Sequence, residues 1–297
     1  MKRWMLYILS VLLLIGCTRV PSPVAETNLP SPTSTPATLE TIVEMVVTLA
    51  PTFTPVPTDT PAPSPTPTAT PEPTATPEPT PEPTATPDPN RPMVALTFDD
   101  GPNNVYTMQF LDVLEKYGVR ATFFVLASAI HDDNGYILQR MVDLGCEIGV
   151  HGQNHDMMTG FDASTNAKRI ERTKLEISEA IEGGYETHLM RPPGGNRNSN
   201  VLRGAKYAET AVILWSVDSA DWKVRNKAKI LDTVETKVTN GSIVLFHDRI
   251  QQTLEAIDEL IPWLLDQGYE LVTVTELLES AGGTIEYGNV YRKKDIG

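Results

Sequence analysis

Five short polar clusters after residue 90 carry side chains that could perform catalysis. They are Thr97-Phe98-Asp99-Asp100-Gly101-Pro102, His151-Gly152-Gln153-Asn154-His155, Arg191-Pro192-Pro193-Gly194-Gly195, Asp218-Ser219-Ala220-Asp221-Trp222 and His247-Asp248. Two histidines four residues apart, joined by a carboxylate from another cluster, form a set that binds a divalent metal and leaves open positions for water and substrate. Neutral imidazoles and one carboxylate suit zinc, and cobalt, iron or nickel would also fit. Three of the chain's five histidines lie in these clusters, so the pattern favours a metal site over structural histidines.

The clusters follow apolar runs that predict β-strands. Strands are predicted at Val94–Phe98, Ala121–Leu126, Glu147–Val150, His188–Met190, Ala211–Trp215, Ser242–Phe246 and Glu270–Thr273. Helical patterns lie between them at Met108–Tyr117, Tyr136–Leu144, Ala163–Ile181, Asn198–Ala205, Lys227–Val238 and Gln251–Gln267. This alternation predicts buried parallel strands, in either a doubly wound sheet or a small, distorted barrel. In both folds the clusters would meet at the C-terminal strand ends, the face that carries active sites.

The first residues predict a bacterial export signal. Lys2 and Arg3 precede an apolar run, Trp4–Ile15, that is too short to span a membrane but fits a signal-peptide core. The run ends in Leu14-Ile15-Gly16-Cys17, which resembles the lipoprotein box. Residues 1–16 are therefore expected to be removed and Cys17 to be lipidated, which gives a durable membrane anchor. The alternative is an ordinary signal peptide with an incidental cysteine.

Composition separates a spacer from a folded domain. Of the 25 prolines, 21 lie between Pro21 and Pro92, and such a stretch builds no hydrophobic core. Residues 17–90 are expected to be a disordered Pro/Thr-rich spacer of polyproline II character, with one apolar interruption at 39–49. Residues 91–280 are expected to form the domain, and residues 281–297, which lack an apolar period, a peripheral tail.

The net charge of −14 and the absence of a basic stripe argue against nucleic acid as a partner.

Cysteine usage argues against a disulfide-stapled fold, because the chain has two cysteines in all. With Cys17 lipidated, Cys146 has no intramolecular partner and is expected to be a small buried residue.

The order TFDDGP, HxxxH, RPPxG, DxxDW and an apolar strand ending in His-Asp resembles the polysaccharide deacetylases, the NodB-homology domain of carbohydrate esterase family 4, from Arg91 to Leu278. The resemblance implies a distorted (β/α) barrel, here of about seven parallel strands. It also implies that one divalent metal assists removal of acetyl groups from N-acetylated or O-acetylated sugars.

The resemblance assigns three metal ligands: Asp100, His151 and His155. It makes Asp99 the catalytic base. Neighbours in an extended segment point to opposite sides, so a bend at Gly101-Pro102 is expected to bring both carboxylates to the site. Arg191 is expected to hold Asp99 through a charge-assisted pair, because adjacent carboxylates repel unless a positive group lies near each.

The remaining catalytic roles also follow from the resemblance. The backbone N–H of Gly194 would bind the oxyanion, and His247 would protonate the leaving group. A carboxylate matched to Asp221 would raise the pKa of His247. Trp222 and Leu245 would wall the pocket around the acetyl methyl, and ordinary packing at the barrel rim is an equally compatible role for both.

Three positions depart from the family pattern. Gly152 replaces a usual Ser or Thr after the first histidine ligand, Val150 stands where Asn is frequent, and Gly194 replaces an aromatic residue. None of them removes a catalytic group, so an active enzyme is expected.

The expected function is metal-dependent deacetylation of N-acetylated cell-wall polysaccharide. Peptidoglycan amino sugars are the favoured substrate, zinc the favoured metal, and the outer face of the cytoplasmic membrane, with reach into the wall, the favoured location. The alternatives are deacetylation of chitin-like or O-acetylated polysaccharide, an amidase of small amides, and a non-catalytic wall-binding protein on the same scaffold.

Overall fold

The computed structural model describes residue 88 and residues 91–293. The predicted leader, the predicted lipidation site Cys17, the predicted spacer up to residue 87 and the apolar stretch at 39–49 lie outside the described residues. Among the described residues, no helix combines the length and the apolar character needed to cross a membrane.

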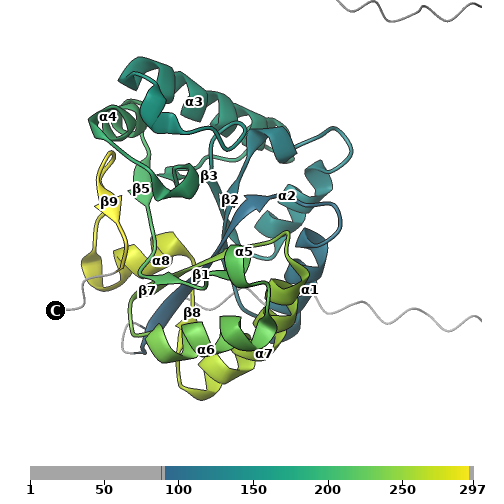
Figure 1. Cartoon of the computed structure of the whole chain (residues 1–297). Coiled ribbons are helices and arrows are strands. Elements are labelled where there is room, and N and C mark those ends of the chain that lie inside the picture. The colour runs from purple at the N-terminus through teal and green to yellow at the C-terminus, as the bar shows by residue number, and fades with distance from the viewer. Residues whose placement is uncertain (1–87, 89–90, 294–297) are drawn as a thin grey trace, which may run out of the picture. The chain divides into compact units, whose positions relative to one another are not determined.

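The described residues form one curled sheet of nine strands (Figure 1). The strands are β1 (Met93–Gly101), β2 (Thr122–Val125), β3 (Glu147–Val150), β4 (Leu189–Met190), β5 (Ala211–Ile213), β6 (Val217–Asp218), β7 (Ser242–His247), β8 (Glu270–Leu271) and β9 (Val290–Tyr291). Their order is β6-β7-β1-β2-β3-β4-β5-β9, with β8 beside β1, and every strand pair is parallel. An antiparallel bridge from Lys293 to Ser242 links the segment after β9 back to β7. This is the distorted (β/α) barrel that the resemblance implies, with nine strands instead of about seven, because β6 and β9 are not among the predicted strands.

The helices of the described residues are α1 (Thr107–Tyr117), α2 (Gly135–Asp143), α3 (Ala163–Glu179), α4 (Ser199–Tyr207), α5 (Asp221–Val224), α6 (Lys227–Lys237), α7 (Gln251–Asp266) and α8 (Val274–Glu279). The longer helices cover the outer face of the sheet (Figure 1), whereas Val274, Leu277 and Leu278 of α8 pack into a smaller core inside the curl. The six longer helices agree with the predicted ones to within about two residues, the usual uncertainty of helix ends.

The buried, uncharged Cys146 precedes β3 and is the free cysteine of the described residues, as expected.

Side chains of β1 alternate between two cores. Val94, Leu96 and Phe98 pack outward against the helices, whereas Met93 and Ala95 belong to a smaller core inside the curl. Because successive strand residues point to opposite faces, this alternation also carries Thr97 and Asp99 to the inner face. The barrel interior is therefore apolar near the N-terminal end of β1 and polar near its C-terminal end.

The segment predicted to be a peripheral tail contributes a strand. Val290 and Tyr291 of β9 pair with Val212 and Ile213 of β5. The sequence analysis predicts no strand there, because two residues are too few to show an alternating pattern.

Candidate active site

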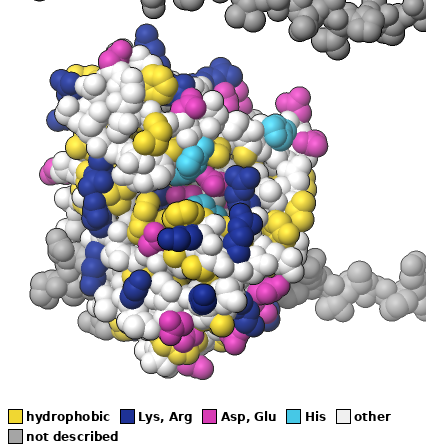
Figure 2. Space-filling model, in the orientation of Figure 1, with side chains coloured by type: hydrophobic (Ala, Val, Ile, Leu, Met, Phe, Trp, Pro, Cys, Tyr) yellow, Lys and Arg dark blue, Asp and Glu magenta, His cyan; other side chains and the backbone are white. Residues whose placement is uncertain are grey.

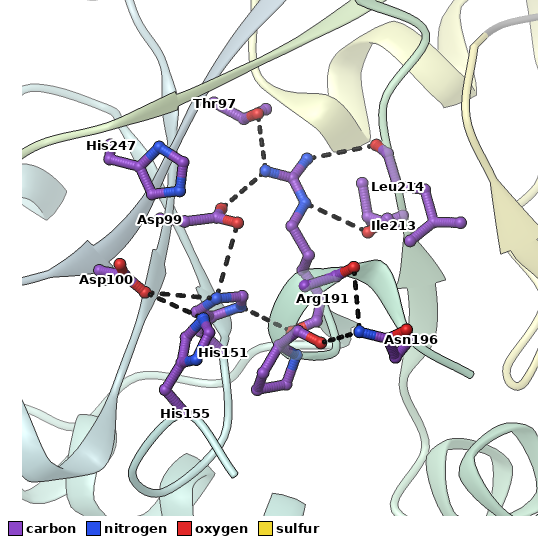
Figure 3. A network of polar contacts seen from close by, with 12 residues as sticks. Thr97, Asp99, Asp100, His151, His155, Arg191, Asn196, Ile213, Leu214 and His247 are labelled. Atoms are coloured by element: carbon purple, nitrogen blue, oxygen red, sulfur yellow. Dashed lines mark hydrogen bonds and ion pairs between the residues drawn. The ribbon is translucent and has the colours of Figure 1, made fainter. Parts of the chain in front are cut away.

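Asp100, His151 and His155 come together as the resemblance implies. One potential ligand atom from each lies within 4.8 Å of the others. The Nε2 atoms of His151 and His155 are 3.5 and 3.7 Å from Asp100 Oδ1 (Figure 3). That oxygen is buried and has no hydrogen-bond partner, which is costly for a carboxylate unless a cation completes its shell. The donor set thus fits a divalent metal.

The ring of His151 is fixed in the orientation that a ligand needs. Its Nδ1 lies 2.8 Å from the carbonyl oxygen of Arg191, so Nδ1–H donates to that oxygen and Nε2 is left with its lone pair facing Asp100. Burial lowers the pKa of His151 by more than the charges of Asp99 and Asp100 raise it. The imidazole is therefore neutral near pH 7, as metal binding requires.

The backbone changes direction at Asp100, directly before the predicted bend at Gly101-Pro102, where the peptide bond is cis. Asp100 has a left-handed φ of 76°, and the pairing register of β1 with β2 shifts between Asp99 and Gly101. This β-bulge aims both carboxylates at the site, and the irregular backbone at Asp100 adds to the bend predicted at Gly101-Pro102. His155 is also left-handed, with φ 62°, and such strained residues concentrate at functional sites.

Asp99 is held by Arg191, which is fully buried. Arg191 Nη1 donates to Asp99 Oδ1 at 2.7 Å and to Thr97 Oγ1 at 2.8 Å (Figure 3). Its Nε and Nη2 donate to the carbonyl oxygens of Ile213 and Leu214, each at 3.2 Å. The guanidinium also lies 4.2 Å from the ring centre of Phe124 in the inner core. The predicted charge-assisted pair is present, and the arginine has no freedom to leave it.

His247 is paired with Asp221. Its Nδ1 lies 2.8 Å from Asp221 Oδ1, while Asp221 Oδ2 accepts hydrogen bonds from the His247 backbone N–H and from the Thr253 hydroxyl, each at 2.8 Å. Burial lowers the pKa of His247, but the hydrogen bond and charge of Asp221, with smaller contributions from Asp99 and Asp100, raise it to about 9. His247 is therefore protonated near neutral pH, as a general acid must be.

These groups face one cavity of about 530 Å³ at the C-terminal rim. Figure 2 shows cyan and magenta side chains at the centre of this hollowed face, bordered by yellow and dark blue side chains. The predicted oxyanion residue Gly194 and the predicted wall residues Trp222 and Leu245 all line it. Gly194 has φ 61°, and a Cβ there would lie 2.7 Å from Asn196 Nδ2. This left-handed conformation, which glycine adopts without strain, suits the departure from an aromatic residue at this position.

The two other departures have local explanations. Gly152 has φ 98°, a conformation that other residues rarely adopt. Val150 is buried in the main core and pairs with Met190 of β4, so an apolar side chain suits the position.

The sequence analysis assigns no role to four residues at or near the site: Trp215, Arg225, Asp248 and Arg249. Trp215, Arg225 and Arg249 line the cavity. Asp248 is fully buried and is not a lining residue. Its Oδ2 accepts a hydrogen bond from Thr107 Oγ1 at 2.6 Å, and its Oδ1 has no hydrogen-bond partner among the described residues. A Cβ at residue 101 would lie 2.2 Å from Asp248 Oδ2, so Gly101 makes room for this carboxyl group. The sequence signal for Asp248 is its place in the polar cluster His247-Asp248.

A curled parallel sheet whose rim joins an Asp-His-His set to an Asp–Arg and a His–Asp pair defines a class of metal-dependent hydrolase folds. Comparison with known sequences agrees: residues 86–213 match the family described as polysaccharide deacetylase. The chain belongs to the polysaccharide deacetylase family.

Three relatives illustrate the similarity. The chain is 43% identical over 190 residues to the peptidoglycan-N-acetylmuramic acid deacetylase PdaC of Bacillus subtilis (strain 168), an alignment that covers 64% of this chain and 39% of PdaC. It is 36% identical over 195 residues to a peptidoglycan-N-acetylglucosamine deacetylase of Bacillus cereus, covering 64% of this chain and 89% of that protein. A family 4 acetyl xylan esterase from Clostridium thermocellum, solved with cobalt, superposes with a TM-score of 0.64 at 32% identity over 69% of this chain and all of that one (100%).

Proposed function

We propose that residues 91–280 form a metal-dependent deacetylase of N-acetylated cell-wall polysaccharide, with peptidoglycan amino sugars as substrate. The observation that carries the proposal is the convergence of Asp100, His151 and His155 with the Asp99–Arg191 and His247–Asp221 pairs on one cavity. The names of the relatives support the polymer, since both curated relatives described above act on peptidoglycan.

The chain's own residues account for the proton transfers of amide hydrolysis. A divalent metal, zinc by preference and cobalt as an alternative, would act as a Lewis acid toward water and the acetyl carbonyl. Asp99 takes a proton from the attacking water, and Arg191 keeps its carboxylate in place. We assign the developing oxyanion to the backbone N–H of Gly194, which lines the cavity. His247 then donates its proton to the leaving amine, so that one water and one acetamide give acetate and a free amine.

The proposed location follows from the sequence of the N-terminal region. A lipid on Cys17 would anchor the chain to the outer face of the cytoplasmic membrane, and the Pro/Thr-rich residues up to 90 would carry the domain into the wall. Peptidoglycan is the first acetylated polysaccharide that a domain placed there would meet.

The test uses the chain from residue 17 with Cys17→Ser, which avoids lipidation, after removal of bound metal. Acetate release is measured on peptidoglycan fragments, N-acetylglucosamine oligomers and acetylxylan, with and without added zinc or cobalt. We expect metal-restored release from peptidoglycan fragments that Asp99→Asn abolishes and that the exposed control Asp133→Asn leaves intact. Release from acetylxylan alone would replace the proposal by O-deacetylation. No release with one equivalent of metal bound would replace it by a binding function.

A further inference from the structure

Two arginines that line the cavity, Arg225 and Arg249, have no role in the chemistry described above. Arg225 follows α5, and Arg249 follows β7 two residues after His247. Strands β6 and β7, which lead into these two segments, are paired at Val217–Val244 and Asp218–Leu245. Both side chains are exposed to solvent and both line the cavity that contains Asp100 and His247.

The positive charge of these arginines is poorly compensated. Arg249 Nη1 lies 3.6 Å from Asp100 Oδ2, and that carboxylate is assigned to the metal. Arg225 makes no ion pair with any residue in the described part of the chain. The lining carboxylate nearest to it in sequence, Asp218, accepts the Ala220 backbone N–H at 2.8 Å. By contrast, Arg191 in the cavity floor is fully engaged. An acidic chain of net charge −14 thus presents two available guanidinium groups at the mouth of its cavity.

The backbone at Arg225 is costly for an arginine. The residue caps α5 in a left-handed conformation, φ 42° and ψ 47°, where glycine or asparagine would avoid a penalty of about 1 kcal/mol. A long cationic side chain kept at such a position, in a cavity that the exposed Trp222 also lines, indicates that the side chain itself is used.

A guanidinium group binds a carboxylate through two parallel hydrogen bonds, so the matching ligand is an anionic group on the sugar. N-acetylmuramic acid carries its acetamido group on C2 and a lactyl carboxylate on the neighbouring C3 oxygen. Because C2 and C3 are bonded to each other, the lactyl carboxylate is carried by the sugar carbon next to the one that carries the reacting acetamido group. N-acetylglucosamine offers these arginines no charge.

We propose that Arg225 and Arg249 form a subsite for a substrate carboxylate, which makes the enzyme favour N-acetylmuramic acid units with a free lactyl carboxylate. The inference rests on the proposed deacetylase function and names the sugar on which it acts. Since both side chains are exposed, added salt weakens the preference.

The experiment compares kcat/KM on glycan strands freed of stem peptides with kcat/KM on the same strands after the lactyl carboxylates are converted to methylamides. Wild-type enzyme is expected to favour the carboxylate form by about tenfold, which corresponds to about 1.4 kcal/mol and suits a hydrogen bond to a charged group. In Arg225→Gln and in the Arg225→Gln, Arg249→Gln double variant, this ratio of kcat/KM values is expected to fall toward one. The fall is expected to come from a higher KM for the carboxylate form. Arg203→Gln, an exposed arginine on α4, is the matched control and keeps the wild-type ratio. Because each ratio is taken within one variant, a general loss of stability or metal does not imitate the result.

A ratio near one in the wild type, or an unchanged ratio in the double variant, overturns the proposal. A preference that occurs only on strands with stem peptides assigns the carboxylate to the peptide and overturns the lactyl assignment. If no substrate releases acetate, the proposed function fails on its own. The subsite is then tested by calorimetry, which measures the Kd of the wild type and of the double variant for each of the two strand forms. The proposal requires that the wild type binds the carboxylate form more tightly than the methylamide form and that the double variant does not.

Discussion

At the residue scale, the acid strength of His247 depends on a carboxylate that is itself buried. Asp221 has no exposed side-chain surface and accepts three hydrogen bonds from His247 and Thr253. Asp221 therefore stays in one position and keeps its charge next to Nδ1 of His247. This arrangement orients the ring and stabilises its protonated form.

Replacing Asp221 should shift the pH profile. In the wild type, kcat/KM falls as the pH rises through about 9, the pKa of His247, because the general acid loses its proton. Asp221→Asn removes the main groups that raise this pKa while burial still lowers it. The pH at which kcat/KM falls is therefore expected to decrease by more than about one pH unit, because the histidine has lost its charged partner.

Thr253→Val is the control for that profile, because it removes one hydrogen bond to Asp221 and keeps the carboxylate. Its falling limb should stay close to that of the wild type. An alkaline limb that is the same in Asp221→Asn would show that His247 is not the group that titrates.

The ionisation of Asp248 makes the stability of the folded domain depend on pH. Burial raises the pKa of this carboxyl group to about 7 from its ordinary value of 3.8, and the Thr107 hydrogen bond offsets only part of the effect. The folded chain therefore holds a proton that the unfolded chain has released. This contribution to stability is complete below about pH 4 and is lost as the pH rises to about 7.

Asp248→Asn should imitate the protonated form. Its Tm in the metal-free state is expected to rise relative to wild type between about pH 4 and pH 7 and to keep a constant advantage above that range. Melting curves across this range measure the difference, with Asp133→Asn as an exposed control. A difference that does not change with pH would mean that Asp248 is ionised throughout.

At the element scale, Arg191 is the joint between three strands. It follows β4, donates to Asp99 and Thr97 of β1, and donates to the carbonyl oxygens of Ile213 and Leu214 at the end of β5. The arginine thus closes the barrel interior above Phe124. Position and charge of the catalytic base depend on the same contacts that hold the strand ends together.

A double-mutant cycle tests this coupling. Arg191→Met leaves Asp99 buried and unpaired, so we expect a loss of about 3–5 kcal/mol in the free energy of unfolding without metal. Combining it with Asp99→Asn should cost clearly less than the sum of the two single changes, because the second change removes the unpaired charge. Urea unfolding measures all four proteins. Additive losses would show that the pair is not coupled.

The element scale also explains what the sequence could predict. Helices of nine or more residues show an apolar period, so α3 and α7 are predicted closely, whereas the four-residue α5 and two-residue β6 are not. The five clusters predict the rim and its metal ligands. The left-handed Asp100 is not predictable, because the bulge depends on how β1 pairs with β2. Asp248 and Arg225 likewise acquire their surroundings from distant segments.

At the scale of the whole molecule, β9 protects the edge of the barrel. The backbone N–H groups of Val212 and Leu214 donate to the carbonyl oxygens of Asn289 and Tyr291, at 2.8 and 2.7 Å. Without β9, β5 would become an open edge strand. Because Leu214 also supplies a carbonyl oxygen to Arg191, the C-terminal segment is connected to the catalytic base through β5.

A chain that ends at Gly282 should therefore fold but be less stable. Loss of the two β5 hydrogen bonds and the Lys293–Ser242 bridge is expected to cost about 2–3 kcal/mol, which lowers Tm by about 5–10 °C for a domain of this size. Cys146 reports the same change: burial raises its pKa to about 12, so the thiol is inert until the domain opens. In a Cys17→Ser background, the shortened chain should react with a thiol reagent faster than a chain that ends at Lys293 and retains β9. Equal Tm and labelling rates in the two chains would show that the segment is peripheral after all, whereas a shortened chain that cannot fold would make β9 essential to the barrel.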